Sequence, residues 1–425
     1  EQYLHLPLQE AIKALNYLES YFDMEFNLPR LQILAAKHFM FGGMENYGLI
    51  IIIEKLFLKP PMNMNEMTAY EITPMERQMI DMLSAPNILD QMANFMRHSS
   101  LMQLSTMMDE QSATLVVNTL SQPACFSILS QVITHEIVHM WAGDIVSPKW
   151  WDALWLNEGF ATLLPSLMFD EYHPEFTFIK LYDDSTNQMA LALDSLEGTR
   201  PIHGSIISES DGFDMMSYNK AGAVLRMIRN LVGPIRFRNA YRSFLKDFCY
   251  KSADTIDLMQ KFIDYFDPNG KNNGNISPGE GAFNFDVKTF FDAWIYKDGF
   301  PLIVLEDSSI RQMPFSPGDE KRIWPIPLQI LYGKQNTDEV KTKTLFLEGE
   351  ELNIDDIDAD WVVINPGLES FCRVWYVGDW LTNAIVFGLK HLNEREKSIF
   401  RIDLMLLCTR GYVDSSDVEL LQSYY

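Results

Sequence analysis

The stretch from residue 131 to residue 160 holds side chains that could bind a metal ion. His135, Glu136 and His139 form an H-E-x-x-H pattern, and Glu158 follows in the segment WLNEGFA. Residues four positions apart lie on the same face of a helix, so both imidazoles can point at one ion. We expect a second helix to return Glu158 as the third ligand. Three protein ligands leave one position open, which is typical of catalytic zinc sites.

These ligands favour zinc, because imidazole nitrogen and carboxylate oxygen are groups that zinc binds well. We therefore predict one Zn²⁺ per chain. The ion would polarise a peptide carbonyl and lower the pKa of its bound water toward ~7. Glu136 would act as the general base that takes a proton from this water and passes it to the leaving amine. The alternative interpretation of His135 and His139 is a pair of core histidines.

A second motif, Gly42-Gly43-Met44-Glu45-Asn46, precedes the metal-binding pattern. With H-E-x-x-H and WLNEGFA, it resembles the M1 family of zinc aminopeptidases, the gluzincins related to aminopeptidase N. The family motif G-x-M-E-N binds substrate, and its glutamate binds the free α-ammonium group. The resemblance therefore implies a substrate-binding role for residues 42–46, with Glu45 at the ammonium. An enzyme that removes N-terminal residues must recognise this charge beside the scissile bond. The alternative for Glu45 is an acid in a solvent-facing turn.

A tyrosine farther along the chain completes the resemblance. Tyr218 lies in the segment SYNKAGA, which is similar to the family's Y-x-K-G-A. The resemblance implies that its hydroxyl hydrogen-bonds the developing oxyanion opposite the zinc, as donors of an oxyanion hole do. The alternative is a half-buried tyrosine that only packs at the start of a helix.

The elements that must position these residues can be predicted from the hydrophobic pattern. Residues 1–30 have Leu8, Ala11, Ile12 and Leu15 at helical spacing, and residues 31–58 contain two strand-length apolar runs on either side of the GGMEN turn. The metal helix is expected from Ser121-Gln122-Pro123 to about Gly143. The segment WWDALWLNEGFATLL is expected to form the second metal helix, with mostly helical structure from residue 166 to residue 266.

Short β-rich runs separated by turn residues begin after Phe300, which predicts a small β-sandwich. Helical spacing returns from Trp380. The fold class that follows is a multidomain α+β protein. The resemblance implies a thermolysin-like, mainly helical zinc metallopeptidase domain over residues 1–300, a β-sandwich over 301–378 and the start of a C-terminal helical domain over 379–425.

A methionine-rich segment at about residues 59–110 predicts a helical insertion. The simplest interpretation is a small unit that packs its methionine face on the main body. An adaptable peptide-binding or lid surface is the alternative. The chain begins without methionine, and we expect a processed or trimmed piece that lacks the family's N-terminal domain and most of its C-terminal domain.

The charge composition limits the classes of binding partner. The chain has 58 acidic and 34 basic residues, for a formal net charge of −24, which argues against nucleic acid because phosphate contacts need clustered Lys and Arg. The longest apolar run, Leu49 to Ile53, is too short to span a bilayer. The four cysteines contain no C-x-x-C pair. The compartment stays open between the cytoplasm and the extracellular part of a membrane-anchored protein, and so does the oligomeric state.

The leading functional hypothesis is an aminopeptidase that acts on peptides with a free N-terminus. An epoxide hydrolase of the leukotriene A4 type is a second hypothesis, and the β-rich runs after residue 300 argue against it because that branch lacks such a domain. A third hypothesis is a catalytically impaired relative that serves as a binding protein or ectodomain. Loss of a site residue would favour it, and all of them are present.

Overall fold

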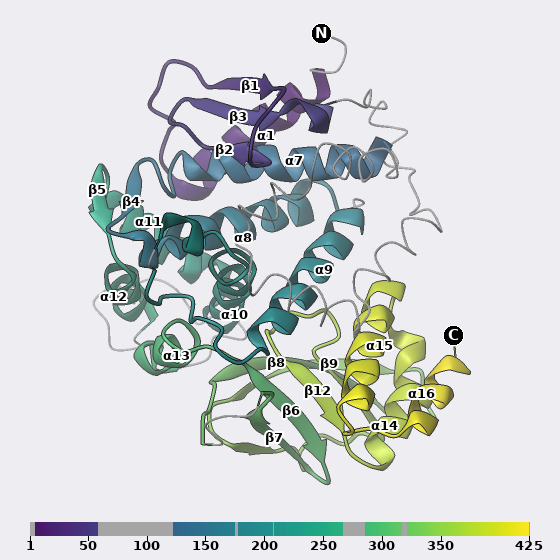
Figure 1. Ribbon diagram of the computed structural model, residues 1–425. Helices are drawn as coiled ribbons and strands as arrows, with labels where there is room; N and C mark the ends of the chain where they lie inside the picture. The colour runs from purple at the N-terminus through teal and green to yellow at the C-terminus, as the bar shows by residue number, and fades with distance from the viewer. Residues whose placement is uncertain are drawn as a thin grey trace.

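The computed structural model describes residues 5–57, 122–174, 177–206, 208–266, 285–316 and 321–424. Within them, helices dominate up to residue 294, strands fill residues 301–376, and helices return from residue 379 (Figure 1). The insertion predicted at 59–110 lies outside the described residues. None of the helices in the described part of the chain has the length and apolar character needed to cross a membrane.

Helix α1 (His5–Phe22) confirms the first predicted helix and packs against α7 (Gln122–His139). Its apolar face differs from the expected one, since the side chains of Leu8 and Ile12 are 50% and 59% exposed. The buried face is instead marked by Ala14 and Leu18, spaced by one helical turn.

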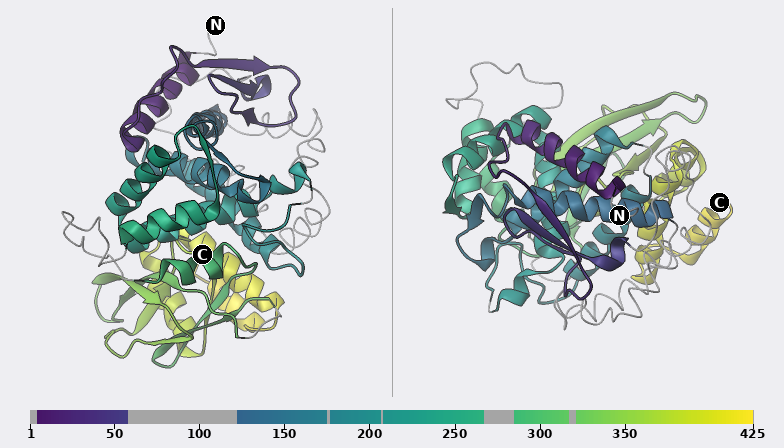
Figure 2. Two further views of the ribbon diagram at one scale, coloured as in Figure 1. Left: turned by 90° about the vertical axis from the view of Figure 1, so that its left-hand side faces the viewer. Right: turned by 90° about the horizontal axis from the view of Figure 1, so that it is seen from above.

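A three-stranded sheet lies beside these helices, at the end of the molecule opposite the later strands (Figures 1 and 2). It contains β1 (Gln32–Ala36), β2 (Gly43–Met44) and β3 (Leu49–Ile53) in the order β1-β3-β2. Both predicted strands are present, and they run parallel. The segment expected to be only a turn contributes β2, an antiparallel edge strand that contacts α7.

Both helices predicted to carry the metal ligands are present, with corrected boundaries, since the second begins at Trp155 rather than Trp150. Helix α7 ends at His139 rather than near Gly143, where φ is +142°, a value that favours glycine. After β4 (Val146–Pro148) and the 3₁₀ turn Trp151–Ala153, helix α8 (Trp155–Tyr172) packs directly on α7.

The next helices surround α8. They are α9 (Thr177–Asp194), the 3₁₀ turn η3 (Glu209–Gly212), the π-helix η4 (Met216–Lys220), α10 (Ala221–Val232), α11 (Pro234–Asp247), α12 (Thr255–Phe266) and α13 (Val287–Trp294). Between α11 and α12, β5 (Lys251–Ala253) pairs with β4 in parallel. A Cβ added to Gly159 would lie 3.0 Å from the Cβ of Ala221, so glycine lets α8 approach α10 closely. This close contact brings the start of α10 beside the second metal helix.

The β-rich region forms two sheets, as the turn-separated runs predict. The first has the order β10-β7-β6-β12, and the second has the order β11-β8-β9. The strands are β6 (Pro301–Glu306), β7 (Ser309–Pro314), β8 (Ile326–Gly333), β9 (Val340–Leu347), β10 (Glu351–Asn353), β11 (Trp361–Ile364) and β12 (Arg373–Tyr376). Helices α14 (Asp379–Asn383), α15 (Glu394–Thr409) and α16 (Ser415–Gln422) follow, with the π-helix η5 (Ala384–Gly388) after α14.

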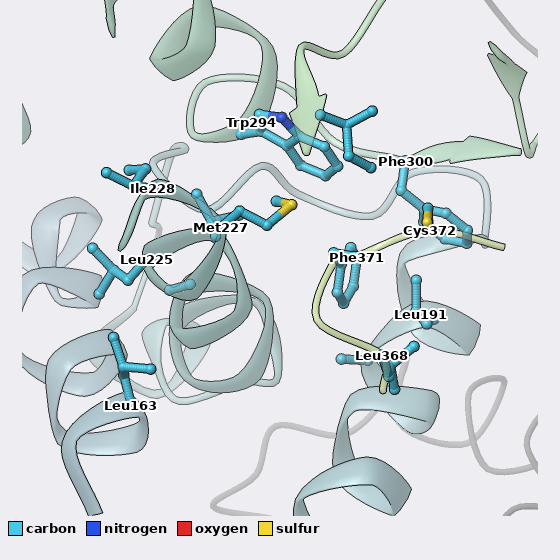
Figure 3. Packing of buried hydrophobic residues seen from close by; sticks show 14 of the residues in the cluster. Leu163, Leu191, Leu225, Met227, Ile228, Trp294, Phe300, Leu368, Phe371 and Cys372 are labelled. Carbon is cyan, nitrogen blue, oxygen red and sulfur yellow. The ribbon is translucent and has the colours of Figure 1, made fainter. Parts of the chain in front are cut away.

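The helical and β-rich regions share one continuous apolar core. Figure 3 shows Met227 of α10 beside Trp294, Phe300 and Phe371. Trp294 is the last residue of α13, Phe300 precedes β6, and Phe371 lies in the loop before β12. All four side chains are nearly or fully buried. The β-rich region therefore packs directly on the helices that position the site.

Candidate metal centre

Three ligand atoms form a compact triangle between α7 and α8. The Nε2 atoms of His135 and His139 lie 3.1 Å apart, and Oε2 of Glu158 lies 3.3 Å and 3.4 Å from them. Ligands around a tetrahedral zinc ion with bonds of ~2.0–2.1 Å are separated by about 3.4 Å. The residues present therefore fit a zinc ion, as the spacing of H-E-x-x-H and Glu158 predicts.

The donor set also has the burial and tautomer that a metal requires. The carboxylate atom Oε2 of Glu158 is buried and faces the Nε2 atoms of both histidines. Nδ1 of His139 lies 2.9 Å from the carbonyl oxygen of Ala142, so an Nδ1–H donates there and leaves the Nε2 lone pair facing the triangle. A cation at the centre of the triangle would satisfy these acceptors.

Glu158 is ionised in this setting. Burial opposes the charge, but the charges and hydrogen bonds of His139 and His135 outweigh it and lower the pKa of Glu158 to about 2. The third ligand therefore presents a carboxylate at neutral pH, the form that binds metal ions.

Glu136 and Glu45 lie together beside the triangle. Glu45, Glu136 and His139 each place one candidate ligand atom within 4.8 Å of the others. A Cβ added to Gly43 would lie 2.2 Å from Oε1 of Glu136, so β2 runs directly against this carboxylate. The structure thus brings the GGMEN segment to H-E-x-x-H, although residues 47–134 separate them in the chain.

The environment of Glu136 suits a proton acceptor. Burial, and repulsion by acids that include Glu45 and Glu158, raise the pKa of Glu136 well above its usual range, while His139 partly offsets this shift. A carboxyl group with a raised pKa holds a proton more firmly than an exposed one, which is the property of an effective general base.

Tyr218 lies on the π-helix η4 and faces the first histidine. Its ring stacks on that of His135, with centroids 5.9 Å apart and planes inclined by 2°. Burial, and the charge and hydrogen bonding of Glu158, raise the pKa of the Tyr218 phenol well above its usual range. The hydroxyl therefore stays protonated and can donate a hydrogen bond at the site.

The remaining residues of the GGMEN segment shape its backbone. The carbonyl oxygen of Gly42 accepts a hydrogen bond from the N–H of Ile53 at 3.1 Å, and that of Asn46 accepts from Leu49 at 2.7 Å. Met44 pairs with Ile51 in the sheet. These contacts hold Gly42, Met44 and Asn46 around Glu45.

Sequence reasoning left Asp144 without a role, although it lies in the same stretch as the histidines. Burial and the charge of Glu45 raise the pKa of Asp144 to about 7, while His139 lowers it. Its atom Oδ2 is buried and lacks a hydrogen-bond partner among the described residues. The sequence signal available was an acid five positions after His139, which alone does not indicate burial beside a second acid.

Comparison with known proteins relates the chain to one family of peptidases. Residues 6–75 and 100–294 match the sequence profile of the peptidase family M1 domain. Aminopeptidase M1-D of Oryza sativa subsp. japonica is 28% identical over 395 residues, which cover 89% of this chain and 36% of that protein. Endoplasmic reticulum aminopeptidase 2 of Bos taurus is 25% identical over 405 residues, covering 88% of this chain and 36% of its own length.

An archaeal relative matches almost the whole chain. Tricorn protease-interacting factor F2 of Thermoplasma volcanium is 25% identical over 428 residues, covering 98% of this chain and 44% of that protein. The chain thus spans well under half the length of these curated relatives.

Proposed function

Since the chain belongs to peptidase family M1, we propose that it is a zinc-dependent aminopeptidase that hydrolyses the N-terminal peptide bond of peptides. The observation that carries this proposal is the position of Glu45, which shares one cluster with Glu136 and His139. An acid at that place can bind a substrate's α-ammonium group next to the bond that is cut. The fold we propose for this part is the thermolysin-like arrangement, with ligands on two adjoining helices.

His135, His139 and Glu158 would hold one zinc ion. When bound, zinc supplies a Lewis acid for the peptide carbonyl and lowers the pKa of a bound water. The three ligand atoms are already 3.1–3.4 Å apart, so little rearrangement of side chains is needed for binding.

Glu136 moves the proton in the proposed reaction. It accepts a proton from the attacking water at a carboxylate oxygen and delivers it to the nitrogen of the leaving amine. Because Gly43 has no side chain, β2 leaves room for this carboxylate. Glu136 is not a ligand in the triangle, so its carboxylate is free for this transfer.

Glu45 and Tyr218 recognise the two ends of the reacting residue. The carboxylate of Glu45 binds the α-ammonium, and a charge-assisted hydrogen bond there is stronger than a neutral one. The hydroxyl of Tyr218 donates to the carbonyl oxygen as negative charge develops on it. A peptide with a free N-terminus satisfies both groups at once, whereas an N-acetylated peptide places an uncharged amide beside Glu45.

The test compares a peptide with a free N-terminus and its N-acetylated form. Glu45→Ala should raise KM for the free peptide by about 10–100-fold, the loss expected for a hydrogen bond to a charged group. The residual activity on the acetylated peptide should change little. Glu25→Ala, which removes an exposed acid, is the control for net charge. An equal response of both peptides to Glu45→Ala would remove the ammonium role and favour a binding protein.

A further inference from the structure

The π-helix η4, which carries Tyr218, is held at each end by a charged pair. We propose that Lys220 and Arg200 are positioning residues that fix the place of the Tyr218 hydroxyl. The proposal rests on the proposed function, because Tyr218 must contact the reacting carbonyl for its position to matter.

The end of η4 is fixed by a closed set of buried polar contacts. Nζ of Lys220 lies 2.8 Å from Oδ2 of Asp194, and both side chains are fully buried. The same Nζ donates to the carbonyl oxygen of Gly299 at 3.1 Å, and the N–H of Gly299 donates to Oδ1 of Asp194 at 2.9 Å. Lys220 also lies 5.9 Å from the ring centroid of Phe371. These contacts tie the end of η4 to α9 and to the segment before β6.

The start of η4 is fixed by a second charged pair. The guanidinium of Arg200 donates to both carboxylate oxygens of Asp214, at 2.8 Å and 2.5 Å, and to Oγ of Ser217 at 2.6 Å. Oδ1 of Asp214 accepts from the N–H groups of Met216 and Ser217, each at 3.0 Å. The carboxylate therefore satisfies the first N–H groups of η4, as a helix cap does.

A π-helix needs such support more than an α-helix does. The i→i+5 turn is rare, and where it occurs it is often at a functional site. Tyr218 lies in the middle of the five residues of η4, between Ser217 at the fixed start and Lys220 at the fixed end. A shift of either end would tilt its ring away from the stack on His135. A misplacement of about 1 Å in a reacting group can lower turnover by ~100-fold.

The contacts of Lys220 at the end of η4 also connect the site to the β-rich region. Gly299 lies two residues before β6, and Phe371 lies in the loop before β12, where Figure 3 shows it in the shared core. The position of Tyr218 is thus set partly by packing outside the metal helices.

The experiment uses the full chain and removes each pair without leaving an isolated buried charge. Replacing Lys220 alone would leave Asp194 buried and unpaired, which destabilises proteins strongly. The test variant is therefore Lys220→Met with Asp194→Asn, in which the amide oxygen still accepts from Gly299. Arg200→Lys keeps the charge but removes the two-pronged contact with Asp214. The control is Arg373→Met with Asp403→Asn, a buried pair whose hydrogen bonds reach α9 and α15 rather than η4.

Turnover is measured in a double-mutant cycle with Tyr218→Phe. Both test variants should lower kcat by about 10–100-fold with KM nearly unchanged, since Tyr218 acts on the developing charge. In the Tyr218→Phe background the same changes should cost little further. Equal losses in both backgrounds, or an equal loss in the control, would overturn the positioning role. Full turnover of Tyr218→Phe itself would overturn both this inference and the proposed role of the tyrosine.

A second readout does not depend on activity. Amide hydrogen exchange of a peptide over residues 214–222 is followed in the zinc-free protein. We expect exchange at least ~10-fold faster in the test variants and unchanged exchange in the control, because local opening governs protection. Unchanged protection of this peptide in the test variants would overturn the proposal, even if the enzyme reaction had failed.

Discussion

At the scale of single residues, Gly43 has no room for a side chain, whereas the adjacent Gly42 has. A Cβ at Gly43 would lie 2.2 Å from Oε1 of Glu136, whereas one at Gly42 would meet nothing within 4 Å. Gly43→Ala should therefore displace Glu136 and lower turnover by about 100-fold, with zinc content unchanged because no ligand moves. Gly349→Ala, in the β-rich region where an added Cβ also meets nothing within 4 Å, is the control and should keep most of the activity. Similar activities in the two variants would contradict the close approach of β2 to Glu136.

Asp144 gives the zinc-free protein a predictable pH dependence. Its pKa is about 7 when folded and ~3.9 when unfolded, so the folded state binds more protons between these values. Stability should fall as pH rises from ~4 to ~7 and stay constant above.

Asp144→Asn removes this titration. The variant should match the wild type near pH 4 and be more stable at pH 8, by on the order of 1–2 kcal/mol after allowance for partial exposure. Urea unfolding at both pH values measures the difference. A constant offset between the two proteins across this range would show that Asp144 titrates normally.

Residue type was enough to predict the ligands and Glu136, because few side chains bind zinc or move protons and their spacing is fixed by the helix. Glu45 and Tyr218 needed the family resemblance, since an acid in a turn and a tyrosine beside a helix are common. Asp144 could not be assigned, because its shifted pKa arises from burial beside Glu45, which is distant in sequence.

At the scale of elements, a buried contact between Glu10 and His173 anchors α1 to the end of α8. Oε2 of Glu10 lies 3.1 Å from Nε2 of His173, and Nζ of Lys13 donates to Oε1 at 2.7 Å. Burial opposes ionisation of Glu10, but these hydrogen bonds and charges outweigh it and lower its pKa. A lowered pKa stabilises the fold above the unfolded value of ~4.3, and this contribution is lost as pH falls through the folded value.

Glu10→Gln should therefore destabilise the protein by about 1–3 kcal/mol at pH 7 and by much less near pH 3. Urea unfolding at the two pH values measures this change, with Glu25→Gln as an exposed control. The same loss at both pH values would mean that packing, rather than the ionised carboxylate, explains the effect.

The hydrophobic pattern predicted which segments form helices and strands, but it did not predict how the strands pair or where the elements end. The apolar runs in residues 31–58 predicted strands, but their parallel pairing depends on contacts with α7. Leu8 and Ile12 fit the period of α1 and still face outward, because larger aromatic residues such as Tyr17 and Phe22 occupy the buried side. The π-helix η4 has no local sequence signal, since two distant ion pairs support it.

At the scale of the whole molecule, the shared core predicts that the helical and β-rich regions unfold together. Phe371 is 1% exposed and packs between them (Figure 3). Phe371→Ala should cost about 3–5 kcal/mol, as large-to-small changes of buried aromatic residues do. Circular dichroism and tryptophan fluorescence should still report one urea transition, and Met405→Ala at a more exposed site should change little. Two separate transitions would contradict a common core.

The succession of helical, β-rich and helical regions was predictable, because the hydrophobic pattern changes near residues 300 and 380. The domain boundaries at 300 and 378 stay a prediction, because the core runs across the first of them. The contact of Lys220 with Gly299 joins residues far apart in the chain, and no local pattern marks it.

Zinc content and turnover, measured on the wild type and Glu136→Gln, test the central claim most directly. Both proteins should contain one zinc ion per chain, since Glu136 is outside the ligand triangle. The wild type should hydrolyse aminoacyl anilides, and the variant should lose turnover by about 10²–10⁴-fold, as the removal of a general base predicts. Loss of zinc from the variant, or a zinc-loaded wild type that turns over none of a panel of substrates, would contradict the account.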